Sequence, residues 1–399
     1  MGALNWLVLF FTHPLEFRSL LQFYIYHEQK RDIKAIKEHP TSGWDRDSMQ
    51  KCWSFLDKTS RSFAAVIKEL EGDLARTVSR PYISLSLLQI LTFMQICLFY
   101  LVLRGLDTIE DDMTIPDDIK QPILRSFHKH TVTPGWTFDG CGPNEKDRQL
   151  LIEYDIVVEE LNRLTPEYVF ISLPTTPADW QPRSYKAVIV DICHKMEIGM
   201  ADYAHKAATT GSIYLDTVSE YDLYCHYVAG LVGEGLSRLF SVSKKEASWL
   251  GDQLELSNSM GLLLQKTNII RDYREDVEQK RHFWPREIWG KHGFKEMIEM
   301  CAWEGKEGPE AEDIKRRVSA VQSGMILDAL RHATDALDYL RVLKNQSVFN
   351  FCAIPAVMAL ATLALCFNNS DMFLRNIKIR KAEAAEVGGV LFVGDLTLF

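Results

Sequence analysis

Two short acidic clusters, at residues 107–112 and 272–276, have the residue types and the spacing to bind a divalent cation. Asp107 and Asp111 are four residues apart, and so are Asp272 and Asp276, so on a helix each pair would lie on one face. Magnesium prefers a few carboxylate oxygens together with water and substrate phosphates. Two such helices facing each other across a cavity would hold magnesium ions that bind and ionise an allylic diphosphate. The spacing therefore predicts a diphosphate site.

Polar residues extend each acidic cluster along its helix. An isolated acidic cluster is usually a solvated helix face. Here the polar positions recur every three to four residues, which would place them on one stripe of each helix. The two stripes are Tyr100, Arg104, Asp107 and Asp111, and Gln265, Asn268, Asp272 and Asp276. A buried polar stripe without partners is costly, so a ligand or ion cavity between helices is the favoured interpretation.

The composition excludes several classes of protein. With 399 residues, of which 47% are hydrophobic and 25% charged, the chain can bury a large core. A net charge of −9 and the absence of a recognisable motif argue against nucleic-acid binding. The eight cysteines show no zinc-type spacing, so we expect reduced thiols in a cytosol-facing protein, most of them in the core.

Helical periodicity dominates the chain, and no convincing strand alternation is present. Proline and glycine cluster between the periodic segments, but none of these breaks resembles a long flexible linker. We therefore expect one all-α domain over residues 1–386, a helical bundle around a central cavity. The expected helical segments are residues 48–72, 96–113, 144–164, 186–208, 220–240, 246–279, 312–344 and 352–367.

Residues 83–103 carry no charge and are long enough to span a bilayer. They run directly into Arg104 and Asp107, so a helix that carries the acidic cluster would belong to a protein core. A membrane protein that uses this segment as a span is the alternative. Residues 6–11 are apolar but too short, and too poor in basic residues, for a secretory signal.

Six motifs in the chain closely resemble those of the squalene synthase family, in the family's order. They are residues 59–63 (Thr-Ser-Arg-Ser-Phe), 99–112, 224–233, 264–276, 281–285 (Arg-His-Phe-Trp-Pro) and 348–355. The resemblance covers about residues 15 to 385. It implies the all-α isoprenoid-synthase fold and the condensation of two farnesyl diphosphates, through presqualene diphosphate, to squalene. The implied cofactors are Mg²⁺ and NADPH.

The resemblance assigns roles to individual residues. The magnesium ligands, or residues that support them, would be Asp107, Glu110, Asp111, Asp272 and Asp276. The guanidinium groups expected near the diphosphates are those of Arg61, Arg104, Arg271 and Arg281. Structural ion pairs are the alternative role for these arginines.

Tyr224 matches the family's catalytic tyrosine, which is thought to handle a proton and to stabilise carbocations with its ring face. A tyrosine in an apolar helix is more often a core residue, but the neighbouring His226 belongs to the same motif. Apolar residues would shield the cations from water. The expected shielding residues are Phe63, Phe349, Phe351, Cys352 and Pro355.

A basic run near the C-terminus resembles the family's contacts to the phosphates of NADPH. It contains Lys378, Arg380 and Lys381, and further candidate contacts are Lys146 and Asn268. The chain has no Gly-x-Gly-x-x-Gly, so a Rossmann site is not implied. A solvated basic face is the alternative.

The chain departs from the family pattern in three places. Residues 78–95 form an apolar insertion that a retained intron of 18 codons would explain, and a second insertion covers about residues 169–184. The first could extend the catalytic helix, expose an apolar patch or displace Asp107. After residue 386 the resemblance fades, and a tail of 13 residues is too short to span a bilayer.

These departures leave alternatives open. The chain could be a phytoene-type synthase that stops before reduction, or an inactive isoprenoid-binding product of a faulty gene model. The family implies a location on the cytosolic face of the endoplasmic reticulum membrane, although the chain as written would be soluble. We expect a monomer that binds farnesyl diphosphate and no nucleic acid.

Overall fold

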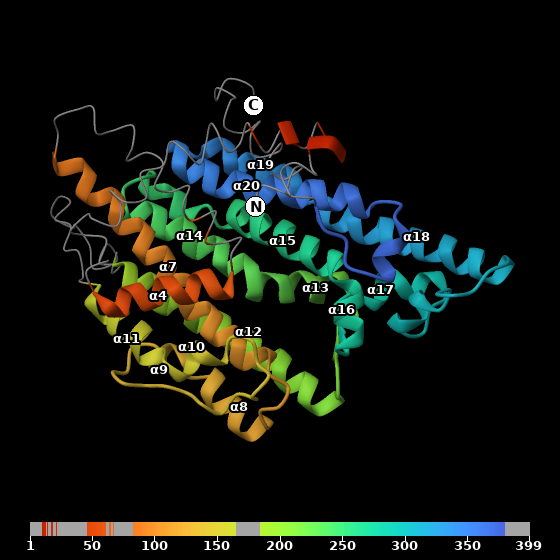
Figure 1. The fold of residues 1–399 in the computed structure, drawn as a ribbon, viewed down its shortest axis with the longest axis horizontal. Helices are drawn as coiled ribbons and strands as arrows, with labels where there is room; N and C mark the ends of the chain where they lie inside the picture. Colours follow the sequence, from red (N-terminus) through yellow and green to blue (C-terminus); the bar gives the residue numbers. More distant parts are fainter. Residues whose placement is uncertain are drawn as a thin grey trace. The chain divides into compact units, whose positions relative to one another are not determined.

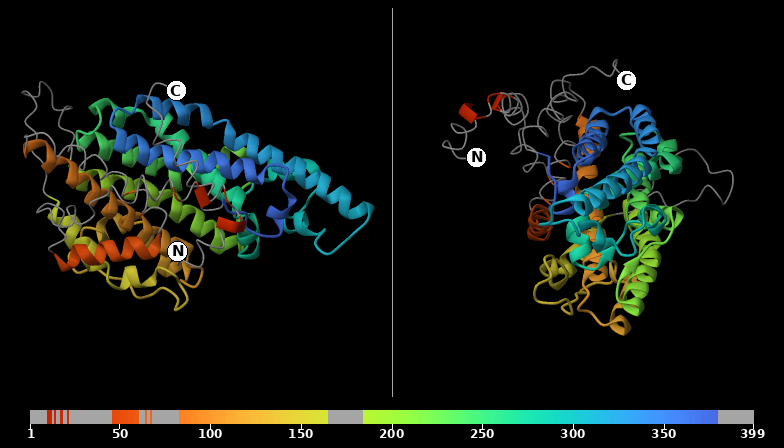
Figure 2. Two further views of the ribbon diagram at one scale, coloured as in Figure 1. Left: turned by 45° about the horizontal axis from the view of Figure 1, so that its top comes forward. Right: turned by 90° about the vertical axis from the view of Figure 1, so that its right-hand side faces the viewer.

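Helices make up most of the described chain in this computed structural model (Figure 1). The structure describes residues 46–60, 83–164 and 184–379, with a few single positions before residue 68; for residues 83–93 it describes the backbone alone. Within these ranges the only strands are the two-residue pair β1 (Ile213–Tyr214) and β2 (Arg281–His282), which run parallel. The predicted all-α fold is confirmed. Figure 2 shows the ribbon from two further sides.

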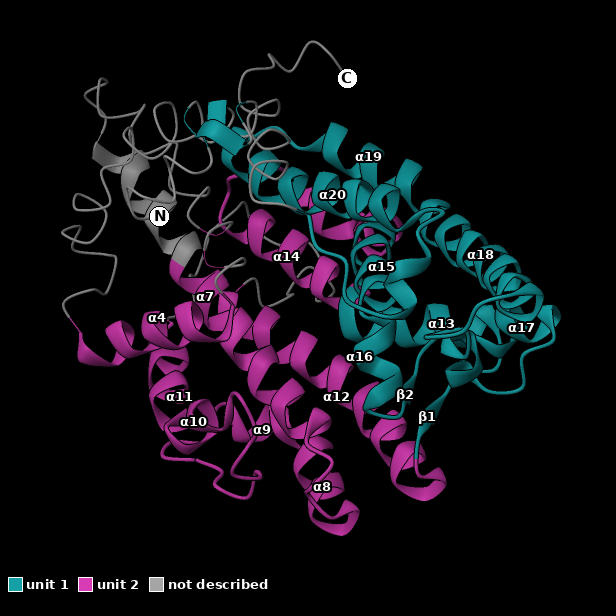
Figure 3. Ribbon diagram, turned by 45° about the vertical axis from the view of Figure 1, so that its right-hand side comes forward, with its two compact units in different colours: residues 1–32, 212–229, 259–399 teal, residues 33–211, 230–258 magenta. Residues whose placement is uncertain are grey.

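The helices belong to two compact units (Figure 3). Unit 2 comprises residues 33–211 and 230–258. Its elements are α4 (Asp47–Thr59), α7 (Ile83–Asp111), α8 (Asp117–Leu124), α9 (Phe127–His130), α10 (Arg148–Ile152), α11 (Tyr154–Arg163), α12 (Tyr185–Thr210), α14 (Leu231–Val242) and the short 3-10 helix η5 (Ser248–Asp252). Helix α7 packs against α4, α11, α12 and α14, so it forms the centre of this unit.

Unit 1 comprises residues 1–32, 212–229 and 259–399. Its elements are α13 (Val218–Cys225), most of α15 (Leu254–Arg271), α16 (Tyr273–Glu278), α17 (Arg286–Trp289), α18 (Pro309–Leu330), α19 (Ala333–Val342), α20 (Gln346–Cys366), the two strands, and the 3-10 helices η6 (Gly290–His292), η7 (Met297–Cys301) and η8 (Ser370–Phe373). Each unit uses separate stretches of chain, so neither is a contiguous domain. The single domain stays a prediction.

Helix α7 joins the apolar insertion to the first acidic cluster without a break. From Met94 to Leu103 every side chain except Tyr100 is buried, with Ile96, Leu98 and Leu101 fully enclosed. This burial supports the interpretation of the segment as a core helix. The first insertion therefore extends the helix that ends in the acidic cluster, one of the three outcomes predicted for it. The second insertion lies almost wholly outside the described residues.

Four predicted helices are divided in the structure, and the first of them, predicted over 144–164, is α10 and α11. The segment predicted as one helix over 246–279 consists of η5, α15 and α16, and the segment over 312–344 is α18 and α19. The segment over 220–240 is interrupted by a π-helical turn, η4 (His226–Gly230). Apolar periodicity continues across a kink because the buried face stays the same, so the pattern does not locate the break.

Helix α20 begins earlier than predicted, at Gln346, because the Asn345 side chain accepts hydrogen bonds from the Ser347 and Val348 backbone N–H groups. Among the described residues it is the one helix long and apolar enough to cross a membrane. Half of its most apolar window is buried, as in a core helix.

All eight cysteines are buried thiols, as predicted.

Candidate active site

Three carboxylates converge in the last two turns of α7. Asp107, Glu110 and Asp111 each place one oxygen within 4.8 Å of the others. The helix repeat brings them together, since positions three and four residues apart share a face. Asp107 is 37% exposed and therefore reachable from solvent. An all-oxygen set with room for water and phosphate suits magnesium.

The electrostatics of this cluster favour a bound cation. The surrounding protein and the neighbouring Asp111 raise the pKa of Asp107 to about 7, against the opposing effect of Arg104. A divalent cation would offset the repulsion that raises this pKa. The three predicted ligands on α7 therefore fit a magnesium ion in position and in charge.

Arg104 lies one turn before Asp107 and joins it to a residue that the sequence analysis did not select. Its Nη1 donates to Asp107 Oδ2 at 2.6 Å, and its Nε donates to Asp147 Oδ2 at 2.6 Å. Burial disfavours the charged guanidinium, but Asp107 and Asp147 raise its pKa above the usual value. Asp147 is 5% exposed. Asp147 fixes the direction of the Arg104 side chain, and no spacing pattern in the sequence indicates this role for Asp147.

Asp112, the last acid of the first motif, has a structural role. Its carboxylate accepts hydrogen bonds from the Thr114 backbone N–H and hydroxyl and from the Gly142 backbone N–H. Burial opposes the charged form, but the Thr114 and Gly142 bonds lower the pKa of Asp112. The Asp112 carboxylate therefore holds the loop that follows α7 by accepting hydrogen bonds from Thr114 and Gly142.

The second acidic cluster is arranged differently. Arg271 donates to both oxygens of Asp272, at 2.9 and 2.5 Å, and Arg281 donates to Asp276 Oδ1 at 2.8 Å. Burial raises the pKa of Asp276 to about 7 even though Arg281 lowers it. Among the described residues Asp272 and Asp276 belong to no group of three converging ligand atoms. Each aspartate has its own arginine.

Asp272 lies at the junction between α15 and α16. The predicted helical spacing of this stripe survives the junction, because Asp272 N–H donates to Asn268 O at 2.9 Å and Asp276 N–H donates to Asp272 O at 3.0 Å. Arg281 lies in β2, whose pairing with β1 holds its backbone. Local turns and one strand pair therefore position both aspartates and Arg281.

Tyr224 is buried near the end of α13, immediately before the π-helical turn η4. Its ring stacks on Phe283 at 4.9 Å between centroids, and the Arg281 guanidinium lies 5.9 Å from the Phe283 ring. Such π-helical turns are frequent at functional sites. The contacts link the predicted catalytic tyrosine to the arginine that pairs with Asp276.

The same motif ends in a glycine that allows two backbones to approach. A Cβ at Gly233 in α14 would lie 2.3 Å from the Ser257 backbone oxygen. No side chain fits there unless the helices separate.

A buried lysine connects three helices of unit 1. Lys266 in α15 is fully buried, and its Nζ donates to Asp222 Oδ1 at 2.5 Å and to Asp328 Oδ2 at 2.6 Å. It also lies 4.9 Å from the Tyr221 ring centroid. Asp222 is two residues before Tyr224 in α13. This network fixes α13 against α15 and α18, and no spacing or motif in the sequence indicates it.

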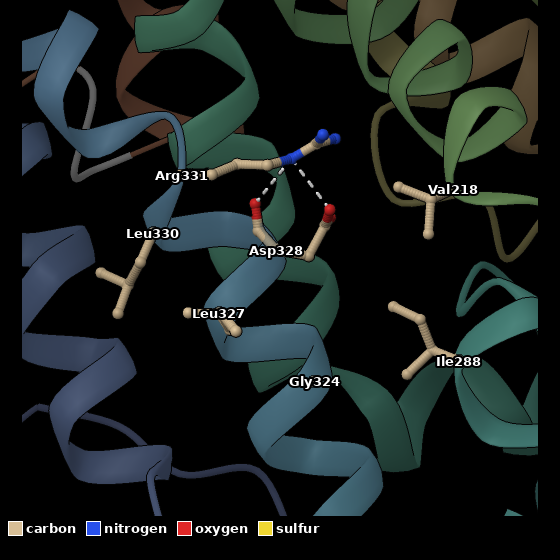
Figure 4. Close-up of a pocket in the computed structure, with 7 residues that line it drawn as sticks. All are labelled: Val218, Ile288, Gly324, Leu327, Asp328, Leu330 and Arg331. Carbon is tan, nitrogen blue, oxygen red and sulfur yellow. Dashed lines mark hydrogen bonds and ion pairs between the residues drawn. The ribbon is translucent and has the colours of Figure 1, made fainter. Parts of the chain in front are cut away.

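A cavity of about 450 Å³ lies beside this network (Figure 4). Its lining residues are Val218, Ile288, Gly324, Leu327, Asp328, Leu330 and Arg331. None of them is among the residues predicted to shield cations. Of those, Phe351 and Cys352 are buried and Phe349 and Pro355 are partly buried in α20. Their predicted role as cavity-lining residues stays a prediction.

The predicted cofactor contacts are exposed where they are described. Lys146, Asn268 and Lys378 all lie on the surface. Asn376, at the start of the basic run, donates from its side chain to Glu275 Oε2 at 3.0 Å. This bond holds the start of the basic run beside α16. The remaining candidates Arg61, Phe63, Arg380 and Lys381 lie outside the described residues.

Comparison with known proteins decides the family. The sequence model described as "Squalene/phytoene synthase" matches residues 75–383. The chain belongs to this family. A squalene synthase of Ganoderma lucidum is 59% identical over 97% of this chain and 76% of its own length. The squalene synthase of Homo sapiens is 42% identical over 93% of this chain and 75% of its own length.

Solved structures of family members agree with the fold. The complex of TcSQS with the ligand BPH1237 is 37% identical, covers 87% of this chain and 86% of its own, and has a TM-score of 0.70. A dehydrosqualene synthase, 15% identical with a TM-score of 0.54, supports the fold alone. The resemblance drawn from the motifs is therefore confirmed. As a member of this family, the chain is an enzyme of the transferase class.

Proposed function

We propose that the chain is a squalene synthase that condenses two farnesyl diphosphates to presqualene diphosphate and reduces this product with NADPH to squalene. The observation that carries the proposal is the convergence of Asp107, Glu110 and Asp111 in a chain similar along nearly its whole length to squalene synthases. The alternative function is that of a phytoene-type synthase, which would catalyse the condensation but not the reduction.

The acidic clusters and their arginines bind the diphosphate. Magnesium held by these carboxylates would neutralise the negative charge of the departing diphosphate. Asp107, Glu110 and Asp111 supply carboxylate oxygens from α7, and Asp272 and Asp276 supply the second set. A guanidinium that donates to a carboxylate can instead donate the same pair of N–H groups to two phosphate oxygens. Arg104, Arg271 and Arg281 are assigned this role, together with Arg61 outside the described residues.

Tyr224 handles the proton that leaves when the cyclopropane ring forms. We assign this role to its phenol group because the residue is buried and matches the family's tyrosine in its motif. The stacked Phe283 ring fixes the orientation of the Tyr224 ring. An aromatic face also stabilises a nearby cation. Phe63, Phe349, Phe351, Cys352 and Pro355 are proposed to exclude water.

The basic run binds the phosphates of NADPH. Lys378 and Arg380 supply the positive charge, and the bond from Asn376 to Glu275 supports a position of the run beside α16. Lys146 and Asn268 are further proposed contacts.

The enzyme is proposed to act as a monomer on the cytosolic face of the endoplasmic reticulum membrane, as its family suggests. Cell fractionation of the tagged chain tests this location.

Product analysis tests the proposal. The purified chain is incubated with farnesyl diphosphate and Mg²⁺, with and without NADPH. We expect squalene only with NADPH and presqualene diphosphate without it. Phytoene-type products in both reactions would support the non-reductive alternative. A folded chain that consumes no farnesyl diphosphate in either reaction would contradict the proposal, and deletion of residues 78–95 would then test whether the insertion blocks activity.

A further inference from the structure

A second group of potential metal ligands lies in unit 2, on elements that the proposed reaction does not use. His128, His194 and Glu197 each offer one ligand atom, and the three atoms lie within 4.8 Å of one another. His194 and Glu197 are three residues apart on α12, so they share a face. His128 comes from α9, which packs against α12. The group therefore joins two separate helices.

One carboxylate oxygen is the meeting point of this group. His128 Nδ1 lies 2.5 Å and His194 Nδ1 lies 2.8 Å from Glu197 Oε1. The other oxygen, Oε2, accepts a hydrogen bond from the His128 backbone N–H at 2.8 Å. Glu197 is fully buried. A buried carboxylate held by a backbone donor through one oxygen presents its other oxygen in a fixed direction.

The donor set differs from that of the Asp107 cluster. Two imidazole nitrogens and one carboxylate oxygen are the ligands that zinc and similar transition metals accept, whereas magnesium prefers oxygen alone. Both histidines point Nδ1 at the same place, and as neutral rings with the proton on Nε2 they would offer two lone pairs there. Glu197 supplies the negative charge.

The geometry requires a small opening. Zinc bonds of about 2.0–2.2 Å in a tetrahedral site separate neighbouring ligand atoms by roughly 3.3 Å, more than the present distances from the two rings to Glu197. His194 is 51% exposed, so its ring can move outward, while Glu197 stays anchored. The exposed side of His194 also gives an ion access from solvent and leaves a fourth position for water.

We propose that His128, His194 and Glu197 form a binding site for a zinc-type transition metal ion, separate from the magnesium site on α7. The ion links α9 to α12, and its binding stabilises the folded protein in proportion to its affinity.

Zinc titration of the full chain tests this site. The protein is freed of metal with a chelator and titrated with Zn²⁺ by equilibrium dialysis in excess Mg²⁺, which competes at carboxylate-only sites. We expect one tightly bound zinc ion and a higher unfolding temperature with zinc. His194→Ala should weaken binding at least ~10-fold and remove the temperature shift. His194 is half-exposed, so this variant should fold; His128→Ala is the second variant.

A matched control separates this site from general histidine binding. His205 lies on the same helix, is similarly exposed and bonds one carboxylate, that of Asp117, at 2.7 Å. His205→Ala should bind zinc as the wild type does, and so should Asp107→Asn. Absence of zinc binding in the wild type, equal affinity in His194→Ala and the wild type, or loss of binding in Asp107→Asn would each overturn the proposal.

Discussion

The two acidic clusters share a sequence pattern but differ in their partners. On α7 three carboxylates converge, and Arg104, which donates to Asp107, is shared with Asp147. Around α16 each aspartate has its own arginine, Arg271 for Asp272 and Arg281 for Asp276. The same spacing of aspartates therefore produces one cluster in which three carboxylates meet and one in which each aspartate pairs with a separate arginine.

This difference predicts different demands on a ligand. A cation at the α7 cluster relieves repulsion between carboxylates directly. At the α16 cluster a cation competes with an arginine for Asp272 or for Asp276, and a diphosphate is a suitable new partner for that arginine. We infer that the α7 cluster binds magnesium before the substrate arrives. The α16 cluster would bind magnesium only together with the diphosphate.

The largest expected effect is that of Asp107→Asn. Removing one of the converging carboxylates should lower formation of presqualene diphosphate at least ~10²-fold, because metal-assisted charge neutralisation contributes several kcal/mol to the transition state. Chromatographic product analysis measures it. Asp118→Asn, an exposed acid in α8, is the matched control and should retain wild-type turnover. Turnover by a folded Asp107→Asn protein near the control rate would contradict the assignment.

Asp272→Asn extends the comparison to the other cluster. The variant should also lose both half-reactions, but it should keep magnesium binding in the absence of substrate, since the α7 cluster is intact. Equilibrium dialysis with Mn²⁺ as a magnesium substitute measures this. Equal loss of substrate-free metal binding in Asp107→Asn and Asp272→Asn would show that the two clusters do not differ as inferred.

Lys266→Met tests the compensated carboxylates of unit 1. The change leaves Asp222 and Asp328 without their buried cation, although Arg331 still pairs with both. Breaking a buried ion pair from one side costs about 3 kcal/mol of unfolding free energy. Denaturant unfolding measures it, with the exposed Lys291→Met as a control. A loss no larger than that of the control would contradict a stabilising role for this network.

Arg281→Lys is expected to have a smaller effect. Lysine keeps the positive charge but lacks the paired N–H donors of the guanidinium. Turnover should therefore fall roughly 10-fold while Asp276 keeps a cationic partner. The Michaelis constant for farnesyl diphosphate should rise as well if Arg281 contacts the diphosphate. Steady-state kinetics separate the two parameters. An unchanged rate and Michaelis constant would leave Arg281 as a structural partner of Asp276 alone.

The smallest expected effect concerns the pH dependence of stability. Burial, Lys266 and Arg331 lower the pKa of His332 to about 4, against the opposing effect of Asp222 and Asp335. The unfolded state therefore takes up the proton first, so the stability due to neutral His332 is present above about pH 6.5 and is lost as the pH falls toward 4. Between pH 7 and about 5.5 the wild type should lose about 1 kcal/mol more unfolding free energy than His332→Gln. Equal losses would contradict this shift.

The comparison also shows what the sequence reveals and what it does not. Helical spacing is a local property, so it predicted that Asp107 and Asp111 share a face, and apolar periodicity predicted the helix that contains Tyr224. The partners of these residues are not local. Asp147 is 43 positions from Arg104, and Lys266 is 44 and 62 positions from its two aspartates. Periodicity identifies which face is buried and contains no information about which distant charge meets it.

Diphosphate release shows whether the carboxylates of α7 hold the magnesium ion that the reaction needs. Release from farnesyl diphosphate is measured in the wild type and in Asp107→Asn while the Mg²⁺ concentration is varied. We expect release that requires Mg²⁺ and saturates with Mg²⁺ concentration in the wild type, with no saturation in the accessible range for the variant. Release without Mg²⁺, or the same magnesium dependence in both proteins, would contradict the claim that the α7 carboxylates hold the ion that drives the reaction.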